Sequence, residues 1–142
     1  MYKATEITVL LVLVLAITAC GSPSSGNING NWTATLANAD GSVAYRFSAT
    51  LARGTDSVLN VTNLTFTTPG PCMSAAEPAT GSFTPTSGAF ALSMASPDVG
   101  GPLMSLEGTL SDSGISGTWS ASVVLLPCSG NGTFTMQRSV AG

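Results

Sequence analysis

Histidine is absent from this sequence of 142 residues, and charged residues of both signs make up only 8% of it. Without an imidazole, neither a catalytic triad with a histidine base nor a metal site with histidine ligands can form. The single lysine, Lys3, lies beside the N-terminus, which leaves no lysine for a Ser-Lys dyad in the rest of the chain. Neither a Gly-x-Ser-x-Gly motif nor a phosphate-binding loop occurs. We therefore expect a protein that is not an enzyme and that needs no cofactor and no metal.

Acidic residues are also few, and their positions do not favour catalysis. A mechanism with paired carboxylates needs two acids that converge in a cleft. The aspartates all fall in predicted turns, where such side chains cap the backbone: Asp40, Asp56, Asp98 and Asp112. Glu107 lies within a predicted strand, on the parity that we expect to face solvent. The formal net charge of -3 makes nucleic acid an unfavourable partner.

Long hydrophobic runs are limited to one, at the N-terminus. The apolar stretch over residues 7–16 is followed by Ile17-Thr18-Ala19-Cys20 and then by a stretch rich in glycine and serine. A membrane-spanning helix needs about 20 apolar residues, and this run is much shorter. A basic residue, a short apolar region and small residues before a cut are instead typical of a secretory signal.

The residues from Ile17 to Cys20 resemble the lipobox of bacterial lipoproteins. The resemblance implies a signal peptide over residues 1–19 and acyl chains on Cys20 that anchor the mature protein in a membrane. More than one chain is needed for stable anchoring, and the family carries two or three. The implied location is the bacterial cell envelope, and the outer membrane if the organism has two, because Gly21 rather than Asp follows the cysteine. An ordinary signal peptide with Cys20 merely nearby is the alternative.

Cysteine is scarce, with three in the whole chain. Acylation of Cys20 would leave Cys72 and Cys128, which in an oxidising compartment are expected to form a disulfide. Two separate buried thiols are the alternative. A redox-active pair is not favoured, because neither cysteine belongs to a Cys-x-x-Cys motif.

The mature chain is predicted to have two parts. Residues 20–29 are mostly Gly, Ser, Pro and Asn, so we expect a lipidated flexible tether with a reach of roughly 15 to 18 Å. Residues 30–142 are enough for one domain with a substantial core. Their polar residues are mainly Ser, Thr and Asn, which suit strands and turns better than helices.

Hydrophobic residues in this domain alternate with polar ones, with a period of two residues rather than the period of a helix. The predicted inward positions are Val43, Tyr45, Phe47, Ala49, Leu51, Phe90, Leu92, Met94, Met104, Leu106, Leu110, Ile115, Gly117, Trp119, Ala121, Val123 and Leu125. Between residues 58 and 66 the parity changes, since Leu59 and Val61 share one face whereas Leu64 and Phe66 take the other. This change predicts a β-bulge near residues 62–63.

Turn residues separate about eight strands, predicted over 31–37, 42–53, 56–68, 79–84, 88–96, 102–111, 114–126 and 132–139. The fourth has little alternation and two nearby prolines, so a loop is the alternative there. The fold class is therefore all-β, an antiparallel meander that closes into a small up-and-down β-barrel. A two-sheet β-sandwich is the alternative, because periodicity alone does not separate the two.

Three residues at the ends of the domain resemble a feature of lipocalin-like (calycin-type) barrels. Gly30-Asn31-Trp32 opens the first strand, and Arg138 lies near the end of the last. In that family a Gly-x-Trp packs its indole at the closed end, beneath an arginine. The resemblance implies that Gly30 opens the strand, Trp32 plugs the barrel and Arg138 covers it by a cation–π contact.

Two functions remain open at this stage. The first is a lipid-anchored envelope protein with a structural or interaction role, whose partner is an envelope protein or a glycan. The second is a carrier of a small hydrophobic molecule in the barrel interior. The residues expected to line such an interior are Tyr45, Phe47, Phe90, Leu92, Met94, Met104 and Leu106.

Overall fold

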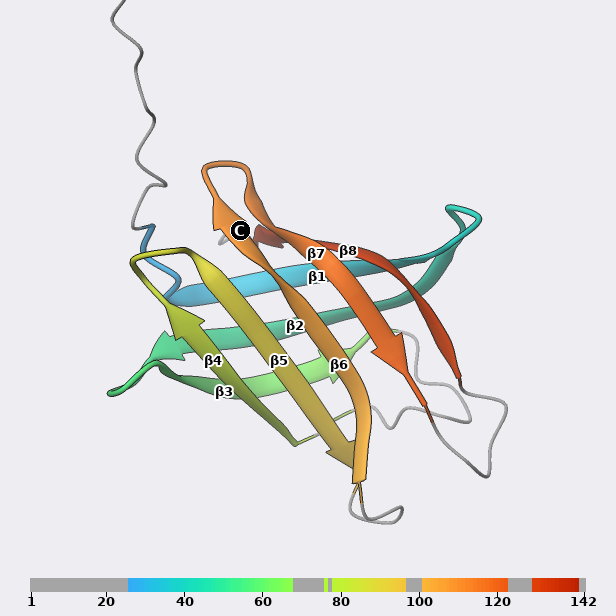
Figure 1. Ribbon diagram of the computed structural model, residues 1–142, viewed down its shortest axis with the longest axis horizontal. Coiled ribbons are helices and arrows are strands. Elements are labelled where there is room, and N and C mark those ends of the chain that lie inside the picture. Colours follow the sequence, from blue (N-terminus) through green and yellow to red (C-terminus); the bar gives the residue numbers. More distant parts are fainter. Residues whose placement is uncertain (1–25, 68–75, 77, 97–100, 123–128, 141–142) are drawn as a thin grey trace, which may run out of the picture.

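A computed structural model of the protein describes residues 26–67, 76, 78–96, 101–122 and 129–140 (Figure 1). Eight strands are formed: β1 (Gly30–Asn38), β2 (Val43–Arg53), β3 (Val58–Phe66), β4 (Ala79–Thr84), β5 (Ala89–Ser96), β6 (Gly101–Ser111), β7 (Gly114–Ala121) and β8 (Gly130–Arg138). The uncertain fourth strand is present. The seventh ends at Ala121, and the last residues predicted for it, 123–126, lie outside the described residues. No helix in the described part of the chain is long and apolar enough to cross a bilayer.

The strands form a closed barrel rather than a sandwich. Each strand pairs antiparallel with the next, and β8 pairs with β1 (Figure 1). Closure pairs β1 and β8, so neither terminal strand is left as a sheet edge. The shortest pairing in the barrel is between β3 and β4, where Val58 pairs with Ser82 and Leu59 with Gly81. The predicted all-β, up-and-down barrel is confirmed, because alternating apolar and polar residues give each strand one face for the core and one for water.

The two ends of the barrel differ in what they carry. The turns β2–β3, β4–β5 and β6–β7 lie at one end, together with residues 26–29 and the end of β8 (Figure 1). We call this the closed end. The β1–β2 turn lies at the opposite end, where the antiparallel order also places the strand ends that flank the other three connections.

The predicted bulge in β3 is confirmed. Ser48 pairs with Thr65, but Thr50 pairs with Thr62, so two residues of β3 lie opposite one residue of β2. Asn63 adopts a left-handed backbone conformation there, with φ of 52°. The extra residue lets Leu64 face the core although it breaks the parity of Leu59.

The inward placement of Val43 is wrong, since 49% of its surface is exposed. Tyr45 pairs with Leu36 and Val43 pairs with Ala37, which leaves Ala44 as an extra residue in β2. This irregularity reverses the inward and outward alternation of β2 next to the β1–β2 turn and directs Val43 to solvent.

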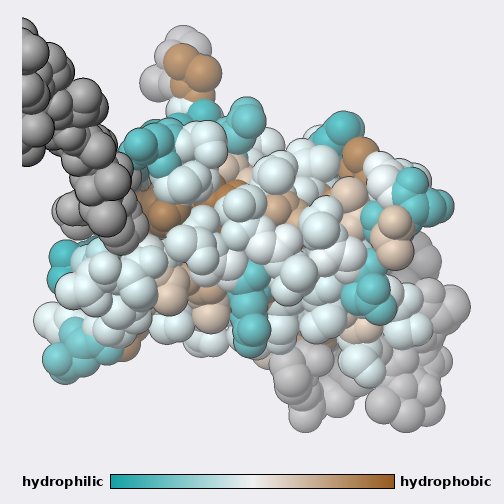
Figure 2. Space-filling view, turned by 45° about the horizontal axis from the view of Figure 1, so that its top comes forward, coloured by the Kyte–Doolittle hydropathy of each residue, from teal (hydrophilic) through white to brown (hydrophobic). Residues whose placement is uncertain are grey.

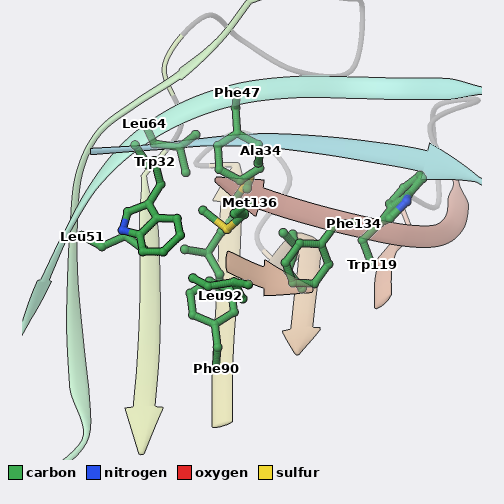
Figure 3. Close-up of a cluster of buried hydrophobic side chains, with 14 of the residues drawn as sticks. Trp32, Ala34, Phe47, Leu51, Leu64, Phe90, Leu92, Trp119, Phe134 and Met136 are labelled. Atoms are coloured by element: carbon green, nitrogen blue, oxygen red, sulfur yellow. The ribbon is translucent and has the colours of Figure 1, made fainter. Parts of the chain in front are cut away.

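The core combines residues from the inward faces of all eight strands with Ile28, which precedes β1. Figure 3 shows part of this cluster. Trp32, Phe47, Leu92, Met94 and Phe134 are among its fully buried members. The visible outer wall is dominated by residues of intermediate hydropathy, with few strongly hydrophobic ones (Figure 2). Glu107 in β6 is exposed, as predicted.

Candidate functional site

Trp32 and Arg138 form a stacked pair at the closed end. The two residues are direct neighbours in the register of β1 and β8. The guanidinium carbon of Arg138 lies 4.7 Å from the centroid of the Trp32 ring. A cation–π contact of this kind contributes about 0.5–2 kcal/mol, depending on how far it is desolvated. The indole is buried and the arginine is exposed, so the pair separates the core from solvent.

Residues 26–29, which we call the N-terminal strap, are fastened across this end by three hydrogen bonds. Trp32 Nε1 donates to the carbonyl oxygen of Ile28 at 2.8 Å. Arg138 Nη1 donates to the carbonyl oxygen of Asn29 at 2.7 Å, and the backbone N–H of Arg53 donates to Asn29 Oδ1 at 2.7 Å. Ile28 is 1% exposed and belongs to the core. The packed part of the chain therefore includes residues that we expected to belong to the tether.

Gly30 allows the strap to turn into β1 beneath the arginine. Its φ of +132° is one that L side chains rarely adopt, and an added Cβ would lie 3.0 Å from Arg138 Nη1. Glycine at this position thus brings the backbone, Trp32 and Arg138 together.

A pocket of about 420 Å³ opens between the strap and the β6–β7 turn. It is lined by Gly26, Asn27, Trp32, Leu110, Ser111, Asp112, Ser113, Gly114 and Arg138. We call it the strap pocket. Its lining combines a cation, an anion, hydroxyl groups and an aromatic edge, which are groups that can orient a small polar ligand.

A second pocket, of about 290 Å³, lies on the other side of the strap. Its lining includes Arg53, Phe83 and Pro85 together with residues 26–29, and it contains no carboxylate. The two pockets share the strap as a wall but differ in charge.

The residues proposed to line a ligand cavity are instead packed together. Phe47, Phe90, Leu92, Met94, Met104 and Leu106 are each at most 3% exposed and belong to one core cluster (Figure 3). Tyr45 is half-buried and makes edge contacts with Phe66 and Trp119, at centroid distances of 6.1 Å and 5.7 Å.

The described interior also offers no unpaired polar group to a ligand. Every buried side-chain nitrogen or oxygen in the described residues has a hydrogen-bond partner. Trp119 Nε1, for example, donates to the carbonyl oxygen of Ala37 at 2.8 Å. Within the same residues, no group of three or more potential metal ligands occurs.

The three cysteines lie outside the described residues, so the lipidation of Cys20 and the disulfide between Cys72 and Cys128 remain predictions. Of the other predicted residues, the structure brings Gly30, Trp32 and Arg138 together at the closed end.

Sequence reasoning missed the strap and the β6–β7 turn as parts of one site. Ile28 is a single apolar residue between two asparagines and has no periodic neighbours, so its burial carries no pattern. Asp112 was interpreted only as a turn residue. Its position beside the strap depends on the closure of the barrel, which joins the end of β8 to the start of β1.

No protein-family model matches this chain, and comparisons with curated proteins and with solved structures found no match. The fold itself defines the class: a small all-β protein with eight antiparallel strands in an up-and-down barrel.

Proposed function

We propose that this protein is a lipid-anchored component of a bacterial cell envelope and that its barrel has a structural or interaction role. The observation that carries the proposal is the sequence from Ile17 to Cys20, with the apolar run before it and the polar stretch after it. Acyl chains on Cys20 would hold the protein at the membrane, in the outer membrane if the organism has two.

The geometry of the strap supports this arrangement. Gly26 lies six residues after Cys20, so a fully extended chain spans at most about 20 Å between them. The strap is fixed to the closed end through Trp32, Arg138 and Arg53. An anchor on Cys20 would therefore keep the closed end near the lipid headgroups and direct the opposite end away from them.

The packing of the interior supports an interaction role over a carrier role. A carrier needs an apolar cavity with a few polar groups that orient the ligand. The candidate lining residues here fill the described interior themselves, and its polar groups are already paired.

The outer wall supports a partner that recognises hydroxyl groups. Threonines point outward at neighbouring positions of β1, β7 and β8. Thr118 and its partner Thr133 are both exposed, and the exposed Thr135 pairs with the half-buried Thr35. Such a surface can exchange hydrogen bonds with a glycan or with an envelope protein. The formal net charge of -3 does not favour nucleic acid.

Native mass spectrometry of protein extracted gently from its own cells tests this function. We expect a barrel that carries acyl chains but no additional bound lipid, and that is retained by isolated envelope glycan or by a cross-linked envelope protein. A stoichiometric hydrophobic molecule that survives extraction would instead establish the carrier. Cys20→Ala is expected to abolish detergent-phase partitioning, whereas the control Cys72→Ala leaves it unchanged.

A further inference from the structure

We propose that the strap pocket binds a zwitterionic lipid headgroup that carries a phosphate and an ammonium group. This inference rests on the proposed anchoring of Cys20, because the anchor brings the closed end to the membrane surface. The pocket volume of about 420 Å³ lies in the range of small-molecule sites.

Arg138 supplies the phosphate-binding part. A guanidinium has five N–H donors, and the hydrogen bond of Arg138 within the described residues uses Nη1 toward the carbonyl oxygen of Asn29. Stacking on Trp32 holds the plane of the group in place. An arginine whose orientation is already fixed loses less conformational freedom when it binds a phosphate.

Asp112 supplies the ammonium-binding part. It lines the same pocket from the β6–β7 turn, beside the hydroxyl groups of Ser111 and Ser113. A carboxylate can accept several hydrogen bonds at once, so an ammonium can be added to the contacts that Asp112 already makes. Arg138 and Asp112 together disfavour a ligand with one charge and favour a ligand with both.

The position of the pocket indicates a lipid headgroup rather than a free metabolite. Gly26 forms part of the pocket wall, and the chain from Gly26 to Cys20 spans at most about 20 Å. Gly26 also lines the pocket on the other side of the strap, but that pocket has Arg53 without a carboxylate. The headgroup of phosphatidylethanolamine carries both a phosphate and an ammonium group. It therefore matches the strap pocket and not the pocket that contains Arg53.

A titration of the mature, acylated protein in a nonionic detergent tests the charge recognition. The probes are glycerophosphoethanolamine and glycerophosphate, and the readout is the NMR signal of Trp32 Nε1–H. The signal of Trp119 Nε1–H, which is hydrogen-bonded to Ala37 at the opposite end, serves as the internal control. We expect glycerophosphoethanolamine to shift the Trp32 signal saturably while the Trp119 signal stays in place.

The variant Asp112→Asn is expected to weaken the binding of glycerophosphoethanolamine about three- to five-fold, the upper part of the range for an exposed ion pair. It should not weaken the binding of glycerophosphate. The control Asp56→Asn removes a carboxylate from the β2–β3 turn at the same end, outside the strap pocket, and should change neither. An unchanged Trp119 signal shows that each variant is folded. The absence of a saturable shift, or equal affinities of Asp112→Asn and wild type for glycerophosphoethanolamine, would overturn the proposal.

A second measurement identifies the source of the headgroup. Hydrogen exchange of residues 111–114 is expected to be slower in phosphatidylethanolamine vesicles than in phosphatidylglycerol vesicles, and Asp112→Asn should remove the difference. Binding in solution without this slowing would overturn the assignment to a membrane lipid. If Cys20 carries no acyl chains but glycerophosphoethanolamine still binds in solution, the proposed anchor is disproved and the pocket is not. The two failures are therefore distinguishable.

Discussion

Ile28 secures the N-terminal strap through a single buried side chain. It is 1% exposed, and its carbonyl oxygen accepts the hydrogen bond from Trp32. We expect Ile28→Ala to lower the free energy of unfolding by about 2–4 kcal/mol, because burial is lost and a cavity remains. Chemical denaturation measures this change. The matched control is Val140→Ala, at a position that is 94% exposed. Equal and small effects of the two changes would show that the strap does not contribute to stability.

Asp40 shows how a turn sets the pKa of one residue. The hydroxyl group of Ser42 donates to Asp40 Oδ1 at 2.6 Å, and the Ser42 backbone N–H donates to the same atom at 2.9 Å. These bonds favour the ionised carboxylate and hold the pKa of Asp40 below its ordinary value of 3.8. The associated stabilisation is present above the unfolded pKa and is lost as pH falls through the lower folded pKa.

Titration of the Asp40 carboxyl carbon by NMR should therefore give a pKa below 3.8 in the native protein. Ser42→Ala should raise that pKa, because the hydroxyl donor is the larger cause of the shift. A native pKa at or above 3.8 would contradict the observed turn geometry.

Individual residues were predicted best where their neighbours in sequence determine their environment. Glu107 follows the alternation of its strand and is exposed, as expected. Ile28 and Val43 were assigned wrongly, because their environments depend on the strap and on a local irregularity of β2 that no short pattern encodes. Trp32 and Arg138 are 106 positions apart in the sequence, and their contact results from the pairing of the first strand with the last.

At the scale of the element, Gly117 allows β6 and β7 to approach closely. Gly117 pairs with Gly108, and an added Cβ would clash with the backbone oxygen of Glu107. We expect Gly117→Ala to destabilise the protein by about 3 kcal/mol, because backbone atoms would have to move. Thermal and chemical unfolding both report this change.

Gly41→Ala is the matched control for crowding. Gly41 lies in the β1–β2 turn with φ of +85°, and an added Cβ would have no atom within 4 Å. Gly41→Ala should therefore lower the free energy of unfolding only by the strain of the left-handed backbone conformation, about 1 kcal/mol. A smaller loss for Gly117→Ala than for Gly41→Ala would show that the strands can separate without penalty.

The predicted disulfide joins two connections between strands. Cys72 belongs to the connection between β3 and β4, and Cys128 to that between β7 and β8. The strand ends that flank both connections lie at the opposite end of the barrel. We expect non-reducing digestion to yield one peptide pair that contains both cysteines, and reduction to lower the free energy of unfolding by about 4 kcal/mol in the chain-entropy account. Alkylation of both thiols in the native, unreduced protein would disprove the bridge.

Strands could be predicted from the sequence more fully than the site. The two-residue period and the turn residues predicted eight strands, with a loop as the alternative for the fourth, and the parity change between Leu59 and Leu64 predicted a bulge near residues 62–63. The distinction between barrel and sandwich required the β1–β8 pairing, a contact between the two ends of the domain. The strap pocket depends on the same contact, and for that reason no local motif indicated it.

At the scale of the whole molecule, the barrel is asymmetric along its axis. The closed end carries the strap, Trp32, Arg138 and two pockets. The interior is filled by side chains, and the outer wall presents hydroxyl groups. An anchor at Cys20 would give this asymmetry a direction, with the strap toward the membrane and the opposite end toward the partner.

The mass of the N-terminal peptide of the mature protein, isolated from the cells that make it, tests this account most directly. We expect the peptide to begin at Cys20 and to carry the added mass of a diacylglyceryl thioether, with or without a third acyl chain on its amino group. A peptide that begins elsewhere, or that contains Cys20 as an unmodified thiol, would contradict the anchored arrangement.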